Sequence, residues 1–348
     1  MVNKNSKSRK TYRVVGIMSG TSLDGVDLAY CQFTVNNKKW AYKLLRVKTI
    51  KYSTAWKRKL ASAHTLSSEA LHQLDGEYGK YLGELCNEFI QNVRGNKVDL
   101  ISSHGHTVFH QPEKGFTYQI GNGNDIYSAT GITVVYNFRQ LDVALNGQGA
   151  PLVPVGDRHL FADFNVCLNL GGIANLSFEK NKQRKAFDVC FTNMALNEIV
   201  KEADMEFDNQ GRLASQGKVN HVLLKKITLL YDKLRPAKPS LSRELYESEF
   251  SNMLSDKRIR MEDRLRTFHQ SIANEIEQAL RFSGQKGKLL VTGGGAFNTY
   301  LISTIKAKLG SPFQLVIPRK EIIEFKEAII FGFLGVLRLR NEKMCIVA

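Results

Sequence analysis

The segment from Gly16 to Asp27 combines glycines, hydroxyl side chains and carboxylates in a short turn. It reads Gly16-Ile17-Met18-Ser19-Gly20-Thr21-Ser22-Leu23-Asp24-Gly25-Val26-Asp27. Backbone N–H groups in such a turn can bind phosphate oxygens, hydroxyls can donate to them, and Asp24 could reach a hydrated Mg²⁺. The chain has no GxxxxGK[ST] motif, which excludes a P-loop. Taken alone, this motif could instead be a structural hairpin turn whose polar side chains form hydrogen bonds with their own backbone.

Two further glycine turns follow predicted strands. Gly293-Gly294-Gly295 separates an apolar strand from a helix, and Gly171-Gly172 follows the apolar run 165–170. A strand, glycine turn and helix let the backbone approach a flat ligand closely and direct the helix N-terminus at it. Many α/β proteins turn on glycines for purely structural reasons, so neither turn is specific alone.

Phosphoryl transfer also needs a group that activates the acceptor. Asp188 ends a predicted strand just before a helix that begins near Asn193. Folds of the α/β class present site residues at this position, which makes Asp188 the candidate base. The alternative is an exposed Asp that caps the helix.

A second polar group lies between two predicted strands. His104, His106 and His110 could contact a ligand or bind a metal, but they lack a fourth ligand nearby, so polar contacts are favoured over zinc. The segment 146–154 is dense in turn formers and carries Gln148. It could be a substrate loop or a plain crossover between domains.

Hydrophobic periodicity predicts the elements that hold these residues. The first half predicts strands at 12–18, 26–35, 40–49, 98–102 and 133–136, and a helix at 67–93. The second half again opens as a hairpin, with strands at 165–170 and 173–178, a short strand ending near 188, helices at 193–203, 219–230 and 262–282, and a strand at 288–292. Alternating strands and helices predict an α/β protein with two related lobes and a cleft between them.

Composition limits the function classes. At 348 residues and 43% apolar content the chain can bury two cores, and its longest nearly apolar stretch, 328–337, is too short to span a membrane. The net charge of +16 raises the hypothesis of a nucleic-acid partner. The basic clusters are short, however, and they are equally compatible with an anionic substrate. Five scattered cysteines suggest neither a disulfide framework nor a zinc site. We expect a soluble, cytoplasmic protein that binds neither nucleic acid nor membranes.

Taken together, five motifs resemble those of the anhydro-N-acetylmuramic acid kinase family, in the family's order. They are 16–27, Ser103-His104-Gly105-His106-Thr107, 147–154, 168–175 and 291–298. The resemblance covers roughly residues 12 to 340. Five motifs in the same order rarely match by chance. The purely structural interpretation of each glycine turn is therefore less favoured than a role in the site.

The resemblance implies a two-lobed, actin-like ATPase fold of ribonuclease H-like type, with lobes at 11–137 plus 330–348 and at 138–329. It implies Mg-ATP as phosphoryl donor and hydrolytic opening of a 1,6-anhydro sugar, giving N-acetylmuramic acid 6-phosphate in cell-wall recycling. It also implies the site residues. Gly20, Thr21, Ser22 and Asp24 fall in the first phosphate loop, Gly171 and Gly172 in the second, Gly293, Gly294 and Gly295 in the adenosine loop, Asp188 on the base, and His104, His106 and Gln148 near the sugar. A homodimer is a further expectation from the family.

This chain departs from the family in three places. Asp-Thr-Gly-Pro-Gly-Asn is replaced by Asp188-Val189-Cys190-Phe191-Thr192-Asn193, although a related Asp-x-Cys pattern occurs in one subgroup. His106 replaces a common Gln, and the tail 341–348 lacks the usual Val-Thr-Gly-Ala ending. An ATP-binding sensor or scaffold without sugar turnover, and a kinase for another sugar, therefore stay open as alternatives.

Overall fold

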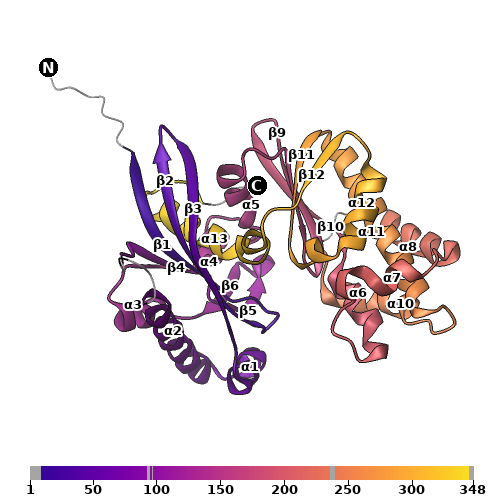
Figure 1. Ribbon diagram of the computed structural model, residues 1–348. Coiled ribbons are helices and arrows are strands. Elements are labelled where there is room, and N and C mark those ends of the chain that lie inside the picture. Colours follow the sequence, from indigo (N-terminus) through magenta and orange to yellow (C-terminus); the bar gives the residue numbers. More distant parts are fainter. Residues whose placement is uncertain (1–8, 92–94, 96, 236–239, 345–348) are drawn as a thin grey trace. The chain divides into compact units, whose positions relative to one another are not determined.

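The computed structural model describes residues 9–91, 95, 97–235 and 240–344 (Figure 1). The chain forms two compact units. The first contains Met1–Phe161 and Phe325–Ala348, and the second contains Ala162–Glu324. Each unit has its own five-stranded sheet and its own apolar core.

The sheet of the first unit has the strand order β3-β2-β1-β4-β7. The bounds are β1 Lys10–Met18, β2 Gly25–Asn36, β3 Lys39–Lys51, β4 Leu100–Ser103 and β7 Val134–Val135. The first three strands are antiparallel, whereas β4 pairs parallel with both β1 and β7. Asn37 and Lys38 both have positive φ, as favoured two-residue hairpin turns require. The predicted hairpin opening and third strand are confirmed.

Helices cover this sheet. They are α1 Thr54–Ala61, α2 Ser68–Gln91, α3 Gly123–Thr130, α4 Phe138–Ala144, α5 Val153–Leu160 and α13 Lys320–Leu339, with the short turns η1 Ala63–Thr65 and η2 Pro112–Lys114. In α2, Leu74, Tyr78, Leu82 and Phe89 are buried in the core, which confirms the predicted amphipathic helix. Its predicted end at Val93 lies outside the described residues.

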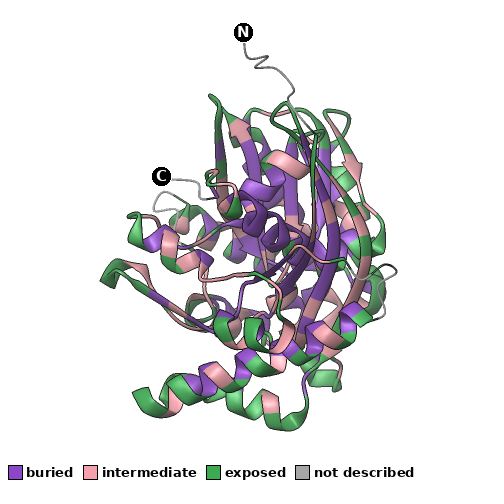
Figure 2. Cartoon of the chain, turned by 90° about the vertical axis from the view of Figure 1, so that its left-hand side faces the viewer, coloured by how far each residue is buried: buried purple, intermediate pink, exposed green. Residues whose placement is uncertain are grey.

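The apolar stretch 328–337 belongs to α13, which packs directly on β1. A Cβ on Gly16 would lie 2.0 Å from the Ala328 carbonyl oxygen, so only glycine permits this approach. Ile329, Phe333 and Leu334 are fully buried in the unit, and Figure 2 shows buried residues along the inner elements. In the described part of the chain, no helix combines the length and hydropathy needed to cross a bilayer.

The segment between β4 and β7, where no strand was predicted, contains a second, two-stranded sheet. Strands β5, His106–Gln111, and β6, Phe116–Ile120, pair antiparallel with an irregularity between Thr107 and Phe109. This irregularity breaks the two-residue alternation, which is why hydrophobic periodicity did not reveal the hairpin.

The second unit repeats the topology of the first. Its order is β10-β9-β8-β11-β12, with bounds β8 Val166–Leu170, β9 Ile173–Lys180, β10 Gln183–Phe191, β11 Gly287–Thr292 and β12 Phe313–Val316. Strand β9 is antiparallel to β8 and β10, and β11 pairs parallel with β8 and β12. Two mixed sheets of the same strand order, together with the helices of both units, confirm the predicted α/β fold class. The cleft expected between the lobes stays a prediction.

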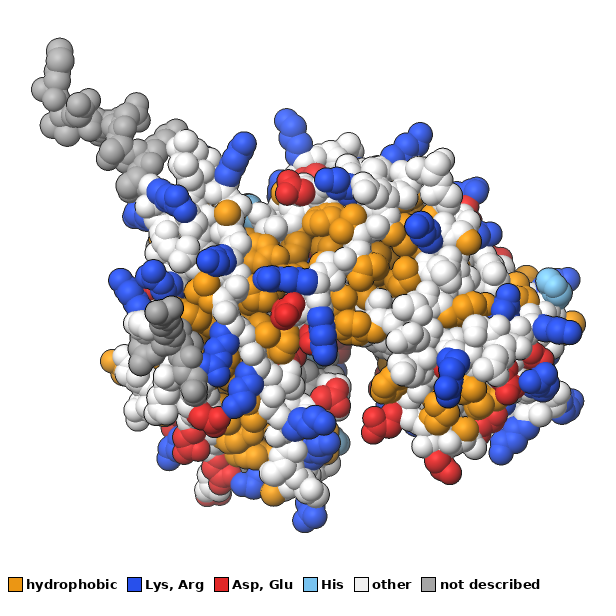
Figure 3. All heavy atoms as spheres, viewed as in Figure 1, with side chains coloured by type: hydrophobic (Ala, Val, Ile, Leu, Met, Phe, Trp, Pro, Cys, Tyr) orange, Lys and Arg blue, Asp and Glu red, His pale blue; other side chains and the backbone are white. Residues whose placement is uncertain are grey.

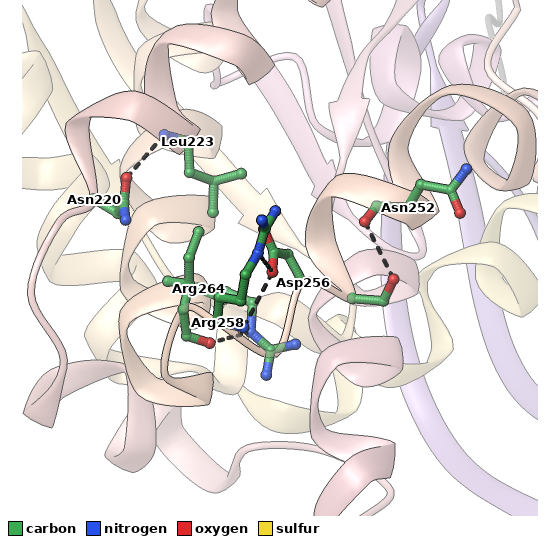
Figure 4. Close-up of polar contacts among 8 residues, drawn as sticks. Asn220, Leu223, Asn252, Asp256, Arg258 and Arg264 are labelled. Carbon is green, nitrogen blue, oxygen red and sulfur yellow. Dashed lines mark hydrogen bonds and ion pairs between the residues drawn. The ribbon is translucent and has the colours of Figure 1, made fainter.

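The second unit is rich in helices. They are α6 Asn193–Val200, α7 Arg212–Gln216, α8 His221–Leu234, α9 Arg243–Leu245, α10 Ser251–Leu254, α11 Met261–Ser283 and α12 Thr299–Leu309, with the turns η3 Lys201–Ala203, η4 Asn209–Gly211, η5 Tyr246–Phe250 and η6 Gly294–Phe297. Arg264 of α11, labelled in Figure 4, is 2% exposed. It pairs with Glu202 and donates to the carbonyls of Leu254 and Ile259. These bonds satisfy the buried guanidinium, whose burial would otherwise be costly.

The units differ from the lobes suggested by the sequence, which divided the chain at 137/138 and 329/330. The observed boundaries lie at Phe161/Ala162 and Glu324/Phe325. Helix α4 packs against β6 and α5 packs against β3, so both helices belong to the first unit. Residues 325–329 join it through α13, where Lys326 forms a buried ion pair with Asp157 at 2.8 Å.

Candidate active site

The turn between β1 and β2 presents polar side chains to solvent. Thr21, Ser22 and Asp24 are exposed, whereas Ser19 is fully buried. The Ser19 hydroxyl donates to the Gly105 carbonyl at 2.8 Å, which ties the turn to the end of β4. The buried residue thus fixes the loop, and the exposed hydroxyls and carboxylate stay accessible to a ligand.

His104 holds an arginine at the edge of the same unit. Its Nδ1–H donates to the Gly105 carbonyl at 2.7 Å, and its Nε2 accepts from Arg139 Nε at 2.8 Å. Arg139 also donates to the Gly149 carbonyl at 3.0 Å, so it anchors the loop that carries the exposed Gln148. Because both ring nitrogens are engaged, His104 is neutral and positions Arg139. Direct sugar contacts of His104 and Gln148 stay predictions.

His106 lies beneath the first glycine turn. It is 4% exposed, its ring meets that of Tyr78 edge to face, and its Nδ1 has no hydrogen-bond partner among the described residues. Burial lowers its pKa to about 4, against an opposing contact with the Gly20 backbone. This neutral imidazole packs behind the loop, and its contact with a ligand stays a prediction.

The two buried histidines predict acid sensitivity of the fold. Burial and the Arg139 charge lower the pKa of His104 to about 3, as burial lowers that of His106. Both folded values lie below the ordinary value of about 6.5, so stability is complete above that pH and declines as the pH falls toward 4. When the pH falls from 7 to 5, the unfolding free energy of wild type should decrease. In His106→Gln we expect this decrease to be smaller by about 2 kcal/mol.

Urea denaturation at both pH values measures this difference. The exposed residue His64 of η1 provides the control, because His64→Gln should follow wild type. An unchanged pH dependence in His106→Gln would show that His106 titrates normally.

The sequence analysis missed Glu327. This residue is exposed on α13 and interacts electrostatically with Arg139, Lys326 and Asp27 of its own unit. Asp27 ends the first glycine motif and accepts from the Thr49 hydroxyl at 2.6 Å. The signal in the sequence was the charged pair Lys326-Glu327 directly before the apolar stretch 328–337.

In the second unit, three chain segments meet at one edge of the sheet. Strands β8 and β11 run parallel and pair through Asn169 and Thr292, so the turns that follow them lie side by side. A Cβ on Gly293 would lie 2.7 Å from Asn169 Oδ1, and one on Gly295 would lie 2.8 Å from Leu170 Cβ. The structure therefore brings the two glycine turns of this unit together.

The start of α6 closes this edge. The Thr192 hydroxyl donates to the Gly171 carbonyl at 2.6 Å, and its backbone N–H donates to the Gly172 carbonyl at 2.9 Å. Asn193 Nδ2 donates to the Leu170 carbonyl at 3.2 Å. These bonds join the second glycine turn to the segment that carries Asp188.

Asp188 lies on β10 with its carboxylate held by backbone and side-chain donors. Its Oδ2 accepts from the Leu241 N–H at 3.0 Å and from the Ser240 hydroxyl at 3.3 Å. Burial raises the pKa of Asp188, and these two donors lower it. A carboxylate with a pKa above that of an ordinary Asp is a better proton acceptor near neutral pH.

The segment after Asp188 that differs from the family pattern belongs to strand β10. The prediction that the strand ends near Asp188 is wrong, because β10 continues to Phe191 with a bulge between Asp188 and Cys190. Cys190 and Phe191 are fully buried, and the Phe191 ring lies 5.4 Å from Tyr246 and 4.9 Å from Phe250. Apolar packing thus fixes the backbone next to Asp188.

Among the described residues, no group of three or more His, Cys, Asp or Glu side chains is arranged to hold a metal ion. On the face drawn in Figure 3, lysines and arginines are scattered among acidic side chains. The exposed oxygens of Thr21, Ser22 and Asp24 suit a hydrated Mg²⁺, which prefers oxygen ligands and keeps several waters.

Comparison with known proteins identifies the family. A sequence model of the family "Anhydro-N-acetylmuramic acid kinase" matches residues 12–343. The chain belongs to the anhydro-N-acetylmuramic acid kinase family. A relative of that name from Mannheimia succiniciproducens is 35% identical, over 94% of this chain and 92% of its own length. One from Vibrio cholerae is 36% identical, over 85% and 83%.

Membership in the anhydro-N-acetylmuramic acid kinase family confirms the resemblance inferred from the five motifs. The match includes all three glycine turns and Asp188. It makes the chain a sugar kinase, and a kinase family implies use of ATP. The predicted difference in the tail falls partly on 345–348, outside the described residues.

Proposed function

We propose that this protein is an ATP-dependent kinase that hydrolytically opens 1,6-anhydro-N-acetylmuramic acid and phosphorylates O6, giving N-acetylmuramic acid 6-phosphate. Family membership over residues 12–343 carries the proposal. The contact of the second glycine turn with Thr192, on the segment that follows Asp188, and the contact of that turn's strand with Gly293 support it. The alternatives of a sensor and of a kinase for another sugar are outcomes of the test below.

The glycine turns would bind the nucleotide. In this assignment Gly20, Thr21, Ser22 and Asp24 contact the phosphates, Gly171 and Gly172 form the second phosphate contact, and Gly293, Gly294 and Gly295 approach the adenosine. Backbone N–H groups suit this task because they donate to phosphate oxygens without adding charge. A Mg²⁺ ion held through water by Asp24 would neutralise charge on the transferred phosphoryl group.

Asp188 would act on water rather than on a sugar hydroxyl. The anhydro bridge leaves O6 without a hydrogen, so Asp188 takes a proton from the water that attacks C1. The C1–O6 bond breaks as the new C1–O bond forms, and O6 accepts the γ-phosphoryl group while ADP leaves. The proton stays on Asp188 until the product departs, so the atoms and charges of the reaction balance.

The altered segment after Asp188 is compatible with this role. Cys190-Phe191-Thr192 stands where the family has Gly-Pro-Gly, and the buried Cys190 and Phe191 hold this backbone within β10. The donors Leu241 and Ser240 keep the carboxylate in one orientation. A protein that had lost sugar chemistry would have no need for this arrangement, and we therefore favour the enzyme.

A coupled assay for ADP release tests the proposal. We expect ATP turnover that depends on 1,6-anhydro-N-acetylmuramic acid, with no turnover on N-acetylmuramic acid, which lacks the anhydro bridge. Turnover on a different anhydro sugar alone would point to another substrate. ATP binding without turnover on any anhydro sugar would favour the sensor.

The proposal extends to the setting of the reaction. Its product would be an intermediate of cell-wall (murein) recycling, and we propose the cytoplasm, where ATP is available, as the site of the reaction. We propose a small-molecule sugar as the partner, with a homodimer as the assembly. Size-exclusion chromatography with light scattering measures the assembly directly.

A further inference from the structure

Asn298 ends the third glycine turn and begins the next helix. Its backbone N–H donates to the Gly295 carbonyl at 3.1 Å, which closes the turn. Its side-chain Oδ1 accepts from the Leu301 N–H at 2.9 Å and caps α12. Gly293, at the start of the turn, has a φ of 81°. Asn298 is therefore hydrogen-bonded both to the Gly293–Gly295 turn and to the first turn of α12.

A buried histidine holds the other end of this side chain. His269 of α11 is fully buried, and Asn298 Nδ2 donates to its Nε2 at 3.0 Å. The His269 Nδ1–H donates to the Leu265 carbonyl at 2.7 Å, which fixes the tautomer with a free lone pair on Nε2. The amide orientation is fixed as well, because only Oδ1 can accept from the Leu301 N–H.

The third side of Asn298 is closed by η4. Gly211 has a φ of 73°, and a Cβ there would lie 2.4 Å from Asn298 Oδ1 and 2.5 Å from Tyr300 Cβ. The Thr299 hydroxyl donates to the Gln210 carbonyl at 3.3 Å. The amide is thus enclosed by α11, α12 and η4, and it cannot move without moving the turn.

We infer that Asn298, held by His269, is a positioning residue that sets the Gly293–Gly295 turn for the nucleotide. The inference rests on the proposed nucleotide role of that turn. Ser, Thr, Asp and Asn can all cap a helix, so capping alone does not require Asn. Asn presents a separate acceptor and donor, Oδ1 for the Leu301 N–H and Nδ2–H for the neutral imidazole, whereas ionised Asp has no donor to offer His269.

Asn298→Asp separates positioning from capping. Aspartate caps α12 as well as Asn does, but it places an oxygen against the lone pair of His269 Nε2. Protonation of His269 would restore a donor. We expect MgADP affinity, measured by calorimetry, to fall about tenfold at pH 8 and to recover most of that loss at pH 6, relative to wild type at each pH.

The surroundings of His269 allow this proton uptake. The Asp208 carboxylate favours the charged imidazole, whereas Arg266 on the same helix opposes it. The Tyr300 ring of α12 lies 5.4 Å from the imidazole. Burial lowers the pKa of His269 in wild type, which favours the neutral imidazole that its two hydrogen bonds require.

Asn220→Asp is the matched control. Asn220 caps α8 through the same bond, with its Oδ1 accepting from the Leu223 N–H at 2.9 Å (Figure 4), and its substitution should leave MgADP affinity unchanged at both pH values. His269→Phe is the second variant. It leaves the Asn298 donor unpaired, so the affinity loss should appear without recovery at pH 6.

The outcomes separate this inference from the proposed function. If wild type binds MgADP and both variants, folded by circular dichroism, bind it equally well, the positioning role is wrong. A deficit in Asn298→Asp that is the same at pH 6 and pH 8 also overturns it. If wild type binds no nucleotide, the proposed function itself fails, and this inference fails with it.

Discussion

Asp188→Asn should slow turnover by about 10²–10⁴-fold while leaving ATP affinity nearly unchanged. The amide keeps the shape of the side chain and can still accept from the Leu241 N–H, but it cannot take a proton from water. The loss should therefore appear in kcat rather than in nucleotide binding. Steady-state kinetics and calorimetric titration with MgADP measure the two quantities separately.

The pH dependence of turnover tests the role of the Asp188 carboxylate independently. Burial raises the pKa of Asp188, so wild-type activity should fall on the acid side at a pH above that of an ordinary Asp. Asp204 of the same unit is exposed and has a left-handed backbone that Asn tolerates, which makes Asp204→Asn the control. Wild-type turnover in Asp188→Asn would remove Asp188 from the mechanism.

Asp24→Ala should raise the KM for Mg-ATP about tenfold or more and leave the KM for the sugar nearly unchanged. Asp24 is the exposed carboxylate of the first glycine turn, and it lies beside the hydroxyls of Thr21 and Ser22. Its removal would take the proposed oxygen ligand away from the hydrated metal without changing the backbone donors. Kinetics at varied ATP and at varied free Mg²⁺ measure the effect.

The metal dependence distinguishes this role from a structural one. If Asp24 supports Mg²⁺, higher free Mg²⁺ should partly restore the activity of Asp24→Ala. Glu84→Ala, which removes an exposed carboxylate from the middle of α2, should behave as wild type. Unchanged Mg-ATP kinetics in Asp24→Ala would exclude Asp24 from the nucleotide site.

Much of the frame was predictable from local patterns. Buried strands with continuous apolar runs, such as β1 and β2, and the long amphipathic α2 follow from hydrophobic patterning alone. The glycine turns follow from composition at strand ends. That Gly171 and Gly293 lie side by side follows from parallel pairing of β8 and β11, which a sequence pattern only suggests.

Other features depend on tertiary packing that local patterns do not encode. The strand at Phe191 continues past Asp188 because aromatic residues distant in sequence, Tyr246 and Phe250, bury its side chain. His104 could be read as a ligand contact, but its bond to Arg139 depends on where α4 packs. The interactions of Glu327 depend on the charged residues that the fold brings near α13, which the local sequence does not specify.

The central claim is that hydrolysis of the anhydro bridge and phosphorylation of O6 are one reaction, and an isotope experiment tests it most directly. Run in ¹⁸O-water with unlabelled ATP and sugar, the reaction should place one heavy oxygen at C1 of the sugar product and none in the transferred phosphate. The product must be sampled early or trapped by reduction, because free hemiacetals exchange this oxygen slowly. An unlabelled sugar phosphate, or label in phosphate released without sugar, would contradict the claim.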